Sequence, residues 1–223
     1  MQDIPGLGKM ILTHNDVIQG EILRTGNWEG HQDEYYEKFI KGGVAIDIGA
    51  NIGVTTLKMA KYASEVHSFE PLFVNWSKLI QHIALNCINA IPYHFALSDK
   101  QDITHYSWVI DGNYGASGLD ISSDKDAEFC QQISKRTPHH YKQIPIYTTT
   151  LDSLHIENVD FIKIDTEGCE ERVLRGSIET VKKWRPVILL EINGSSKTNI
   201  FKFLNDLNYT VEPIGKTDYI ALP

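Results

Sequence analysis

One stretch of the sequence restricts the fold more than any other: the apolar run Val44–Ile48, followed at once by the glycine-spaced turn 49–53. The run is continuous rather than alternating, which is typical of a central strand covered on both faces. Gly49 and Gly53 allow a tight turn and the close approach of a ligand, and free N–H groups at the start of the next helix favour a carboxylate. The sequence therefore predicts a strand, a ligand-binding loop and a helix, in that order.

Other short β-rich runs alternate with amphipathic helical stripes along the chain. The predicted strands are 66–69, 91–96, 160–164 and 187–192, the predicted helices are 34–40, 75–89, 170–183 and 199–207, and a terminal hairpin is predicted at 209–212 and 219–222. This alternation is typical of βαβ units. We therefore expect an α/β fold with a doubly wound, mostly parallel sheet that ends in a C-terminal antiparallel hairpin.

The length of 223 residues favours a single domain over residues 1–223. Residues 1–43 are weakly patterned, and we interpret them as a segment that covers the site. Residues 100–143 are polar and interrupt the rhythm of strands and helices. Because long insertions in compact domains often serve as lids or binding loops, we expect an inserted lid or substrate region there.

Charge and hydropathy exclude several classes of partner. The formal net charge is −8, and the lysines and arginines are scattered rather than clustered, so we expect no nucleic-acid partner. No apolar run approaches the roughly 18 residues of a membrane span, and the N-terminus lacks a basic segment followed by an apolar one. We expect a cytoplasmic protein without a membrane partner. The sequence specifies no oligomeric state.

A carboxylate closes the second predicted strand. Glu70 lies 21 residues after Gly49 and precedes Pro71, which is close to the spacing of about 20 residues at which Rossmann-type folds place an acid on ribose hydroxyls. Asn51 stands where a dinucleotide loop needs its second glycine, which disfavours NAD. A phosphate-binding GxxxxGK[ST] loop is absent from the sequence. S-adenosylmethionine, which has a ribose but no phosphate, fits these features better.

Several motifs, taken together and in order, resemble the FkbM-type family of class I methyltransferases. They are Ile46-Asp47-Ile48-Gly49-Ala50-Asn51-Ile52-Gly53, Phe69-Glu70-Pro71, Ala96-Leu97-Ser98-Asp99, Thr150-Leu151-Asp152, residues 162–170 (IKIDTEGCE) and Leu190-Glu191. The resemblance extends over roughly residues 16–193 and implies a sheet of seven strands.

The resemblance also implies a set of cofactor-binding residues for S-adenosylmethionine. The loop that carries Asp47, Gly49, Asn51 and Gly53 would hold the methionine part of the donor. Glu70 would hold the ribose. Leu97 and Ser98, after the third strand, would lie beside the adenine.

Two further carboxylates, Asp165 and Glu167, follow the fourth predicted strand. They are expected at the carboxyl end of the sheet, where open α/β folds bind their ligands. Either one could be the catalytic base that activates a hydroxyl, or one could hold the donor while the other caps the next helix. Asp165, Glu191 and Asn193 also offer oxygen ligands for Mg²⁺, but nothing in their spacing requires a metal, and we do not favour one.

The acceptor is expected to be a hydroxyl of a small molecule, sugar or glycan. Amino-methylating enzymes usually carry an Asn/Asp-Pro-Pro-aromatic motif after the fourth strand, whereas this chain has residues 165–168 (DTEG) there. Two other functions stay open at this point. One is an NAD-type oxidoreductase, and the other is a non-catalytic module that binds S-adenosylmethionine.

Overall fold

The computed structural model describes residues 1–108, 118–119, 144–192 and 197–223. Its central sheet contains β3 (Val44–Ile48), β4 (Glu65–Phe69), β5 (Ala90–Tyr93), β10 (Val159–Ile164), β11 (Val187–Glu191), β12 (Thr210–Pro213) and β13 (Asp218–Leu222). The seven strands lie in the order β12-β13-β11-β10-β3-β4-β5. The five neighbouring strands β11, β10, β3, β4 and β5 are parallel to one another, and β13 runs antiparallel to both β11 and β12. The mostly parallel sheet with a C-terminal antiparallel hairpin is confirmed.

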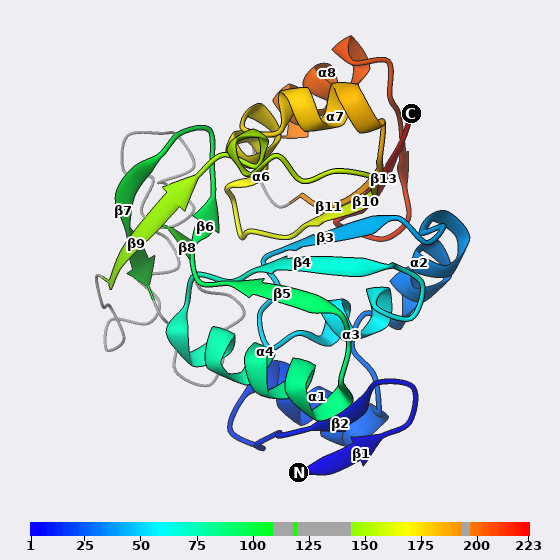
Figure 1. Cartoon of the computed structure of the whole chain (residues 1–223), viewed down its shortest axis with the longest axis vertical. Helices are drawn as coiled ribbons and strands as arrows, with labels where there is room; N and C mark the ends of the chain where they lie inside the picture. Colours follow the sequence, from blue (N-terminus) through cyan, green and yellow to red (C-terminus); the bar gives the residue numbers. More distant parts are fainter. Residues whose placement is uncertain (109–117, 120–143, 193–196) are drawn as a thin grey trace.

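Strand β3 lies at the centre of this sheet, between β4 and β10 (Figure 1). From β3 the chain builds β4 and β5 on one side, and it later returns to build β10 and β11 on the other. The order of strands therefore reverses between β3 and β10. In open α/β sheets, ligands bind outside the carboxyl ends of the strands at such a switch point.

Helices cover both faces of the sheet. On one side lie α1 (Val17–Thr25), α2 (Asp33–Phe39), α3 (Val54–Met59) and α4 (Phe73–Asn86), and on the other lie α6 (Glu170–Arg175), α7 (Ile178–Trp184) and α8 (Lys197–Asp206) (Figure 1). Successive side chains of β3 point to opposite faces of the sheet, so Ile46 packs in the core with α6 to α8, whereas Ala45 packs with α2 and α3. No helix in the described part of the chain is both long and apolar enough to cross a bilayer.

Two smaller sheets flank the central one. One is four-stranded, in the order β6-β9-β7-β8, and contains β6 (Ala96–Leu97), β7 (Asp102–Trp108), β8 (Gly118–Leu119) and β9 (Ile144–Thr149). The other is the N-terminal hairpin of β1 (Gln2–Ile4) and β2 (Gly8–Met10). This hairpin is fastened to α4, because the Asn86 side chain accepts from the N–H of Lys9 and donates to its carbonyl. Most of the expected insertion, residues 109–117 and 120–143, lies outside the described residues.

Two predicted elements are wrong in extent. The strand predicted at 91–96 ends at Tyr93, because Ala96 and Leu97 pair with β9 in the four-stranded sheet. The helix predicted at 170–183 is broken into α6 and α7 around Gly176. A Cβ at Gly176 would lie 2.0 Å from the carbonyl oxygen of Ser98, so the backbone of Gly176 approaches Ser98 more closely than any residue with a side chain could. Both differences come from contacts between segments distant in sequence.

Candidate functional site

A cavity of about 290 Å³ opens at the carboxyl ends of the central strands. This volume is close to the lower end of the range for small-molecule sites, roughly 300 to 1,000 Å³. Carboxylates from three strand ends line the cavity: Glu70 follows β4, Asp165 follows β10 and Glu191 ends β11. The lining also includes Gly49, the first residue of the glycine loop. The cavity therefore lies at the switch point of the sheet.

The glycine loop is fixed by hydrogen bonds within the protein. The N–H groups of Gly49 and Ala50 both donate to the carbonyl of Phe69 at 3.0 Å, and that of Gly53 donates to Ala50. The N–H of Asn51 donates to Glu70 Oε2 at 2.9 Å. The N–H groups of these four loop residues are therefore already paired within the protein rather than offered to a ligand carboxylate. The backbone of the loop follows a tight path beside the cavity, with positive φ at Gly49, Asn51 and Gly53.

Glu70 is held in one orientation beside the glycine loop. Its Oε1 accepts the N–H of Leu72 at 2.7 Å, and its Oε2 accepts that of Asn51. Burial raises the pKa of Glu70 to about 7, although these two hydrogen bonds oppose the increase. Each carboxylate oxygen retains a further acceptor position. The side chain is therefore preorganised to accept hydrogen bonds from a ligand in the cavity.

The other predicted cofactor-binding residues divide into two groups. Gly49, Asn51, Glu70, Leu97 and Asp165 line the cavity, whereas Asp47, Gly53 and Ser98 do not. Asp47 lies on β3 behind the cavity, where it is fully buried and its Oδ2 accepts from the Thr56 hydroxyl at 2.6 Å. Burial raises the pKa of Asp47 to about 6, although Lys163 opposes the increase. This position favours a supporting role for Asp47 over direct contact with a ligand.

The turn after β10 presents the two predicted catalytic carboxylates, Asp165 and Glu167, to the cavity. Buried Glu170 ties this turn together, because its Oε1 accepts from the N–H groups of Thr166 and Gly168 and from the Thr166 hydroxyl. Glu167 has a φ of 53°, a left-handed conformation that is uncommon outside glycine. Such strain persists where the surroundings enforce it, and it is concentrated at functional sites.

Burial raises the pKa of Glu167 to about 8, and the neighbouring charges of Asp165, Glu191 and Glu170 add to the increase. The folded state then binds a proton that the unfolded chain releases above about pH 4.5, so the contribution of Glu167 to stability falls as the pH rises towards about 8.

Glu167→Gln should therefore stabilise the protein at pH 8.5 and have little effect at pH 4. Because Glu167 is partly exposed, we expect a gain on the order of 2 kcal/mol in the free energy of unfolding. Urea unfolding at the two pH values measures this difference. Glu179→Gln, at an exposed glutamate of α7, is the matched control and should show no such pH dependence. An equal effect of Glu167→Gln at both pH values would contradict the prediction.

The N-terminal segment supplies a wall of the cavity, with Val17, Ile18, Trp28 and Glu29 in the lining. A cover was expected from residues 1–43, but Glu29 was not expected in the site, because no periodic pattern marks residues 27–32. Lys58 of α3 anchors the segment, since its Nζ donates to the carbonyl of Trp28 and pairs with Asp33 at 2.7 Å. The Glu29 side chain consequently reaches the strand ends from the opposite side of the cavity.

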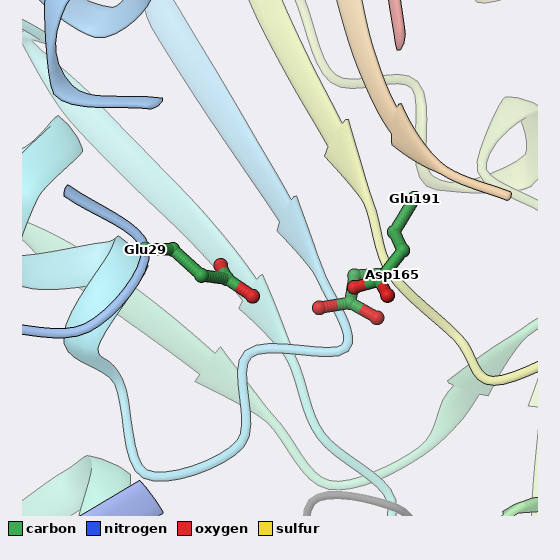
Figure 2. Close-up of side chains that lie close together, drawn as sticks. All are labelled: Glu29, Asp165 and Glu191. Atoms are coloured by element: carbon green, nitrogen blue, oxygen red, sulfur yellow. The ribbon is translucent and has the colours of Figure 1, made fainter. Parts of the chain in front are cut away.

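Three carboxylates converge in this region. Glu29, Asp165 and Glu191 point towards one another (Figure 2), and one oxygen of each lies within 4.8 Å of the others. Lys163 shares this space, with its Nζ 2.9 Å from Asp165 Oδ2 and 3.5 Å from Glu29 Oε2. Asn193, the third oxygen ligand considered from the sequence, lies outside the described residues.

Comparisons with known proteins identify the family and similar folds. The model of the Methyltransferase FkbM domain matches residues 47–211. The fold is similar to that of methyltransferase FkbM from Methylobacillus flagellatus KT, with a TM-score of 0.54 and 13% identity over 85% of this chain. It is also similar to precorrin-6y C5,15-methyltransferase from Geobacter metallireducens GS-15, with a TM-score of 0.51 and 12% identity.

These structural matches differ in how much of the other protein they include. The aligned region spans 50% of the Methylobacillus protein, and 96% of this chain aligns with 92% of the Geobacter protein. No curated protein matches the sequence. The family match includes both the glycine loop and the acidic turn after β10, which form the cavity. This chain belongs to the FkbM family of S-adenosylmethionine-dependent methyltransferases.

Proposed function

We propose that this protein transfers the methyl group of S-adenosylmethionine to a hydroxyl of a small molecule, sugar or glycan. The observation that carries the proposal is the set of carboxylates around one cavity at the switch point, namely Glu29, Glu70, Asp165, Glu167 and Glu191. S-adenosylmethionine has two positive charges, an ammonium and a sulfonium, against one carboxylate, and opposite charges attract strongly in a partly desolvated site. The carboxylates match that charge.

The two ends of the cavity suit the two ends of the donor. Glu70 would accept hydrogen bonds from the ribose hydroxyls, and the apolar lining of Phe69 and Leu97 would pack against the adenine. Asp165 follows β10, on the other side of β3 from Glu70, and would pair with the donor's ammonium. This arrangement directs the sulfonium towards the part of the cavity lined by Glu29, Glu167 and Glu191.

Glu167 is our candidate for the proton acceptor. When bound, S-adenosylmethionine would supply an electrophilic methyl group to the acceptor oxygen. As the C–O bond formed and the C–S bond broke, the hydroxyl proton would pass to the Glu167 carboxylate and S-adenosylhomocysteine would remain as a neutral thioether. A pKa of about 8 makes Glu167 a stronger base than an ordinary carboxylate, and part of it is ionised near neutral pH.

Two conservative variants separate donor binding from transfer. Asp165→Asn should weaken binding of S-adenosylhomocysteine by about tenfold, whereas Glu167→Gln should preserve binding and lower methyl transfer by at least about a hundredfold. Calorimetry measures the first effect. Transfer of labelled methyl groups to a panel of hydroxylated sugars and polyketides measures the second, with Glu179→Gln as the control.

The results also distinguish the alternative functions. Undiminished transfer by Glu167→Gln would exclude Glu167 as the proton acceptor. Donor binding without transfer to any hydroxyl in the panel would favour the non-catalytic binding module. The alternative of an NAD-type oxidoreductase is set aside, because the family is one of methyltransferases and Asn51 replaces the dinucleotide glycine.

A further inference from the structure

A buried lysine lies beneath the carboxylates of the cavity. Lys163 is on β10, and only 3% of its side chain is exposed. Its Nζ donates to Asp165 Oδ2 at 2.9 Å and lies 3.5 Å from Glu29 Oε2. Among the described residues that line the cavity, it is the one positively charged side chain. Its charge therefore acts directly on the carboxylates proposed to hold the donor.

The two carboxylates that Lys163 joins come from distant parts of the chain. Asp165 follows β10, whereas Glu29 belongs to the segment between α1 and α2 and has a φ of 50°. A left-handed conformation is uncommon for a glutamate, and it persists where the surroundings enforce it. The ion pair with Lys163 is the side-chain contact of Glu29 that the structure shows, and it orients the carboxylate towards the cavity.

The charge of Lys163 also offsets repulsion within the cluster. Glu29, Asp165 and Glu191 bring three like charges within 4.8 Å of one another, which is unfavourable without a cation. Burial alone would lower the pKa of Lys163, but Asp165 and Glu29 raise it well above its ordinary value, so the ammonium form persists. A divalent metal ion would offset the same repulsion, but the Lys163 ammonium already pairs with two of the three carboxylates, Asp165 and Glu29.

We propose that Lys163 is a positioning residue whose ammonium stands where a divalent cation would otherwise lie, holding Glu29 and Asp165 at the wall of the donor cavity. The assignment of the cavity to the methyl donor rests on the proposed function, but the role of Lys163 within the cluster does not. The N-terminal segment is thereby tied to the strand ends, and the site needs no metal ion for its assembly.

Removal of the ammonium tests the proposal. Lys163→Met removes the ammonium that pairs with Glu29 and Asp165 beside Glu191, so millimolar Ca²⁺ should bind this variant and raise its Tm by several degrees. Wild type and Lys163→Arg, which keeps the positive charge, should show no Ca²⁺ response. Lys58→Met is the matched control, because Lys58 is also buried and also anchors the N-terminal segment, but it pairs with Asp33. It should lower the Tm without creating a response to Ca²⁺.

Binding of S-adenosylhomocysteine gives a second readout. Lys163→Met should weaken binding by at least about tenfold, with partial recovery in Ca²⁺, and Lys163→Arg should retain most of the affinity. A Ca²⁺ response in wild type, or a folded Lys163→Met variant without one, would overturn the proposal. If wild type fails to bind S-adenosylhomocysteine, the proposed function fails, and the Ca²⁺ experiment still decides the role of Lys163.

Glu29→Gln tests the same ion pair from its other side, and it applies even if Lys163→Met does not fold. Loss of the charge on Glu29 should free the N-terminal segment from β10. Hydrogen–deuterium exchange of a peptide containing residues 27–32 should therefore become faster than in wild type, while exchange in β3 stays unchanged. Equal exchange of that peptide in the two proteins would contradict the proposed positioning.

Discussion

Replacing Gly49 with alanine is expected to destabilise the protein by roughly 3 to 5 kcal/mol and to abolish donor binding. A Cβ at this position would lie 1.7 Å from the carbonyl oxygen of Asp165, and Gly49 has a φ of +89°. The obstacle is backbone rather than a flexible side chain, so the glycine loop and the end of β10 would have to separate. Urea unfolding measures the loss of stability, and calorimetry with S-adenosylhomocysteine measures the loss of binding.

Gly42→Ala is the matched control for this prediction. Gly42 has nearly the same φ, +87°, but nothing lies within 4 Å of the position that its Cβ would take. It should therefore show only the cost of the left-handed conformation, about 1 to 2 kcal/mol, with wild-type donor affinity. If Gly49→Ala were no more destabilising than Gly42→Ala, the close approach of the two loops would not be required for folding.

Glu70→Ala is expected to weaken donor binding by at least about a hundredfold. The variant removes the proposed partner of the ribose hydroxyls, and it also leaves the N–H groups of Asn51 and Leu72 without their carboxylate. Asp160→Ala is the matched control, because Asp160 likewise accepts from two backbone N–H groups, those of Lys41 and Gly43. Asp160 is not part of the cavity lining. Calorimetry should therefore show wild-type affinity for Asp160→Ala.

The pH dependence of donor binding gives a second test of Glu70. Because the pKa of Glu70 is about 7 and the ionised form accepts hydrogen bonds better, donor affinity should increase between pH 6 and pH 8. Glu70→Gln should lose this particular increase. Wild-type affinity in Glu70→Ala, or an unchanged pH profile in Glu70→Gln, would remove Glu70 from the donor site.

The sequence was sufficient for features that depend on neighbouring residues. The apolar run of β3, the glycine turn after it and the acid that follows β4 were all predicted, because strand formation and turn geometry depend on side-chain pattern and glycine spacing. Their meeting at one edge was also predictable, since the carboxyl ends of parallel strands lie together. On this basis Asp165 and Glu167 were expected at the carboxyl end of the sheet, and they line the same cavity as Glu70.

Other features depended on contacts between distant segments, which a single sequence does not encode locally. The pairing of β6 with β9 divided the strand predicted at 91–96, and the approach of Gly176 to Ser98 accompanies the break in the helix predicted at 170–183.

Tertiary structure also decided which acids reach the cavity. It placed Asp47 behind the site and brought Glu29 to it through the ion pair with Lys163. The pattern of residues thus determined which strands form and where they end. Only the packed chain decided which charged side chains share the cavity, because burial and ion pairing depend on the whole fold.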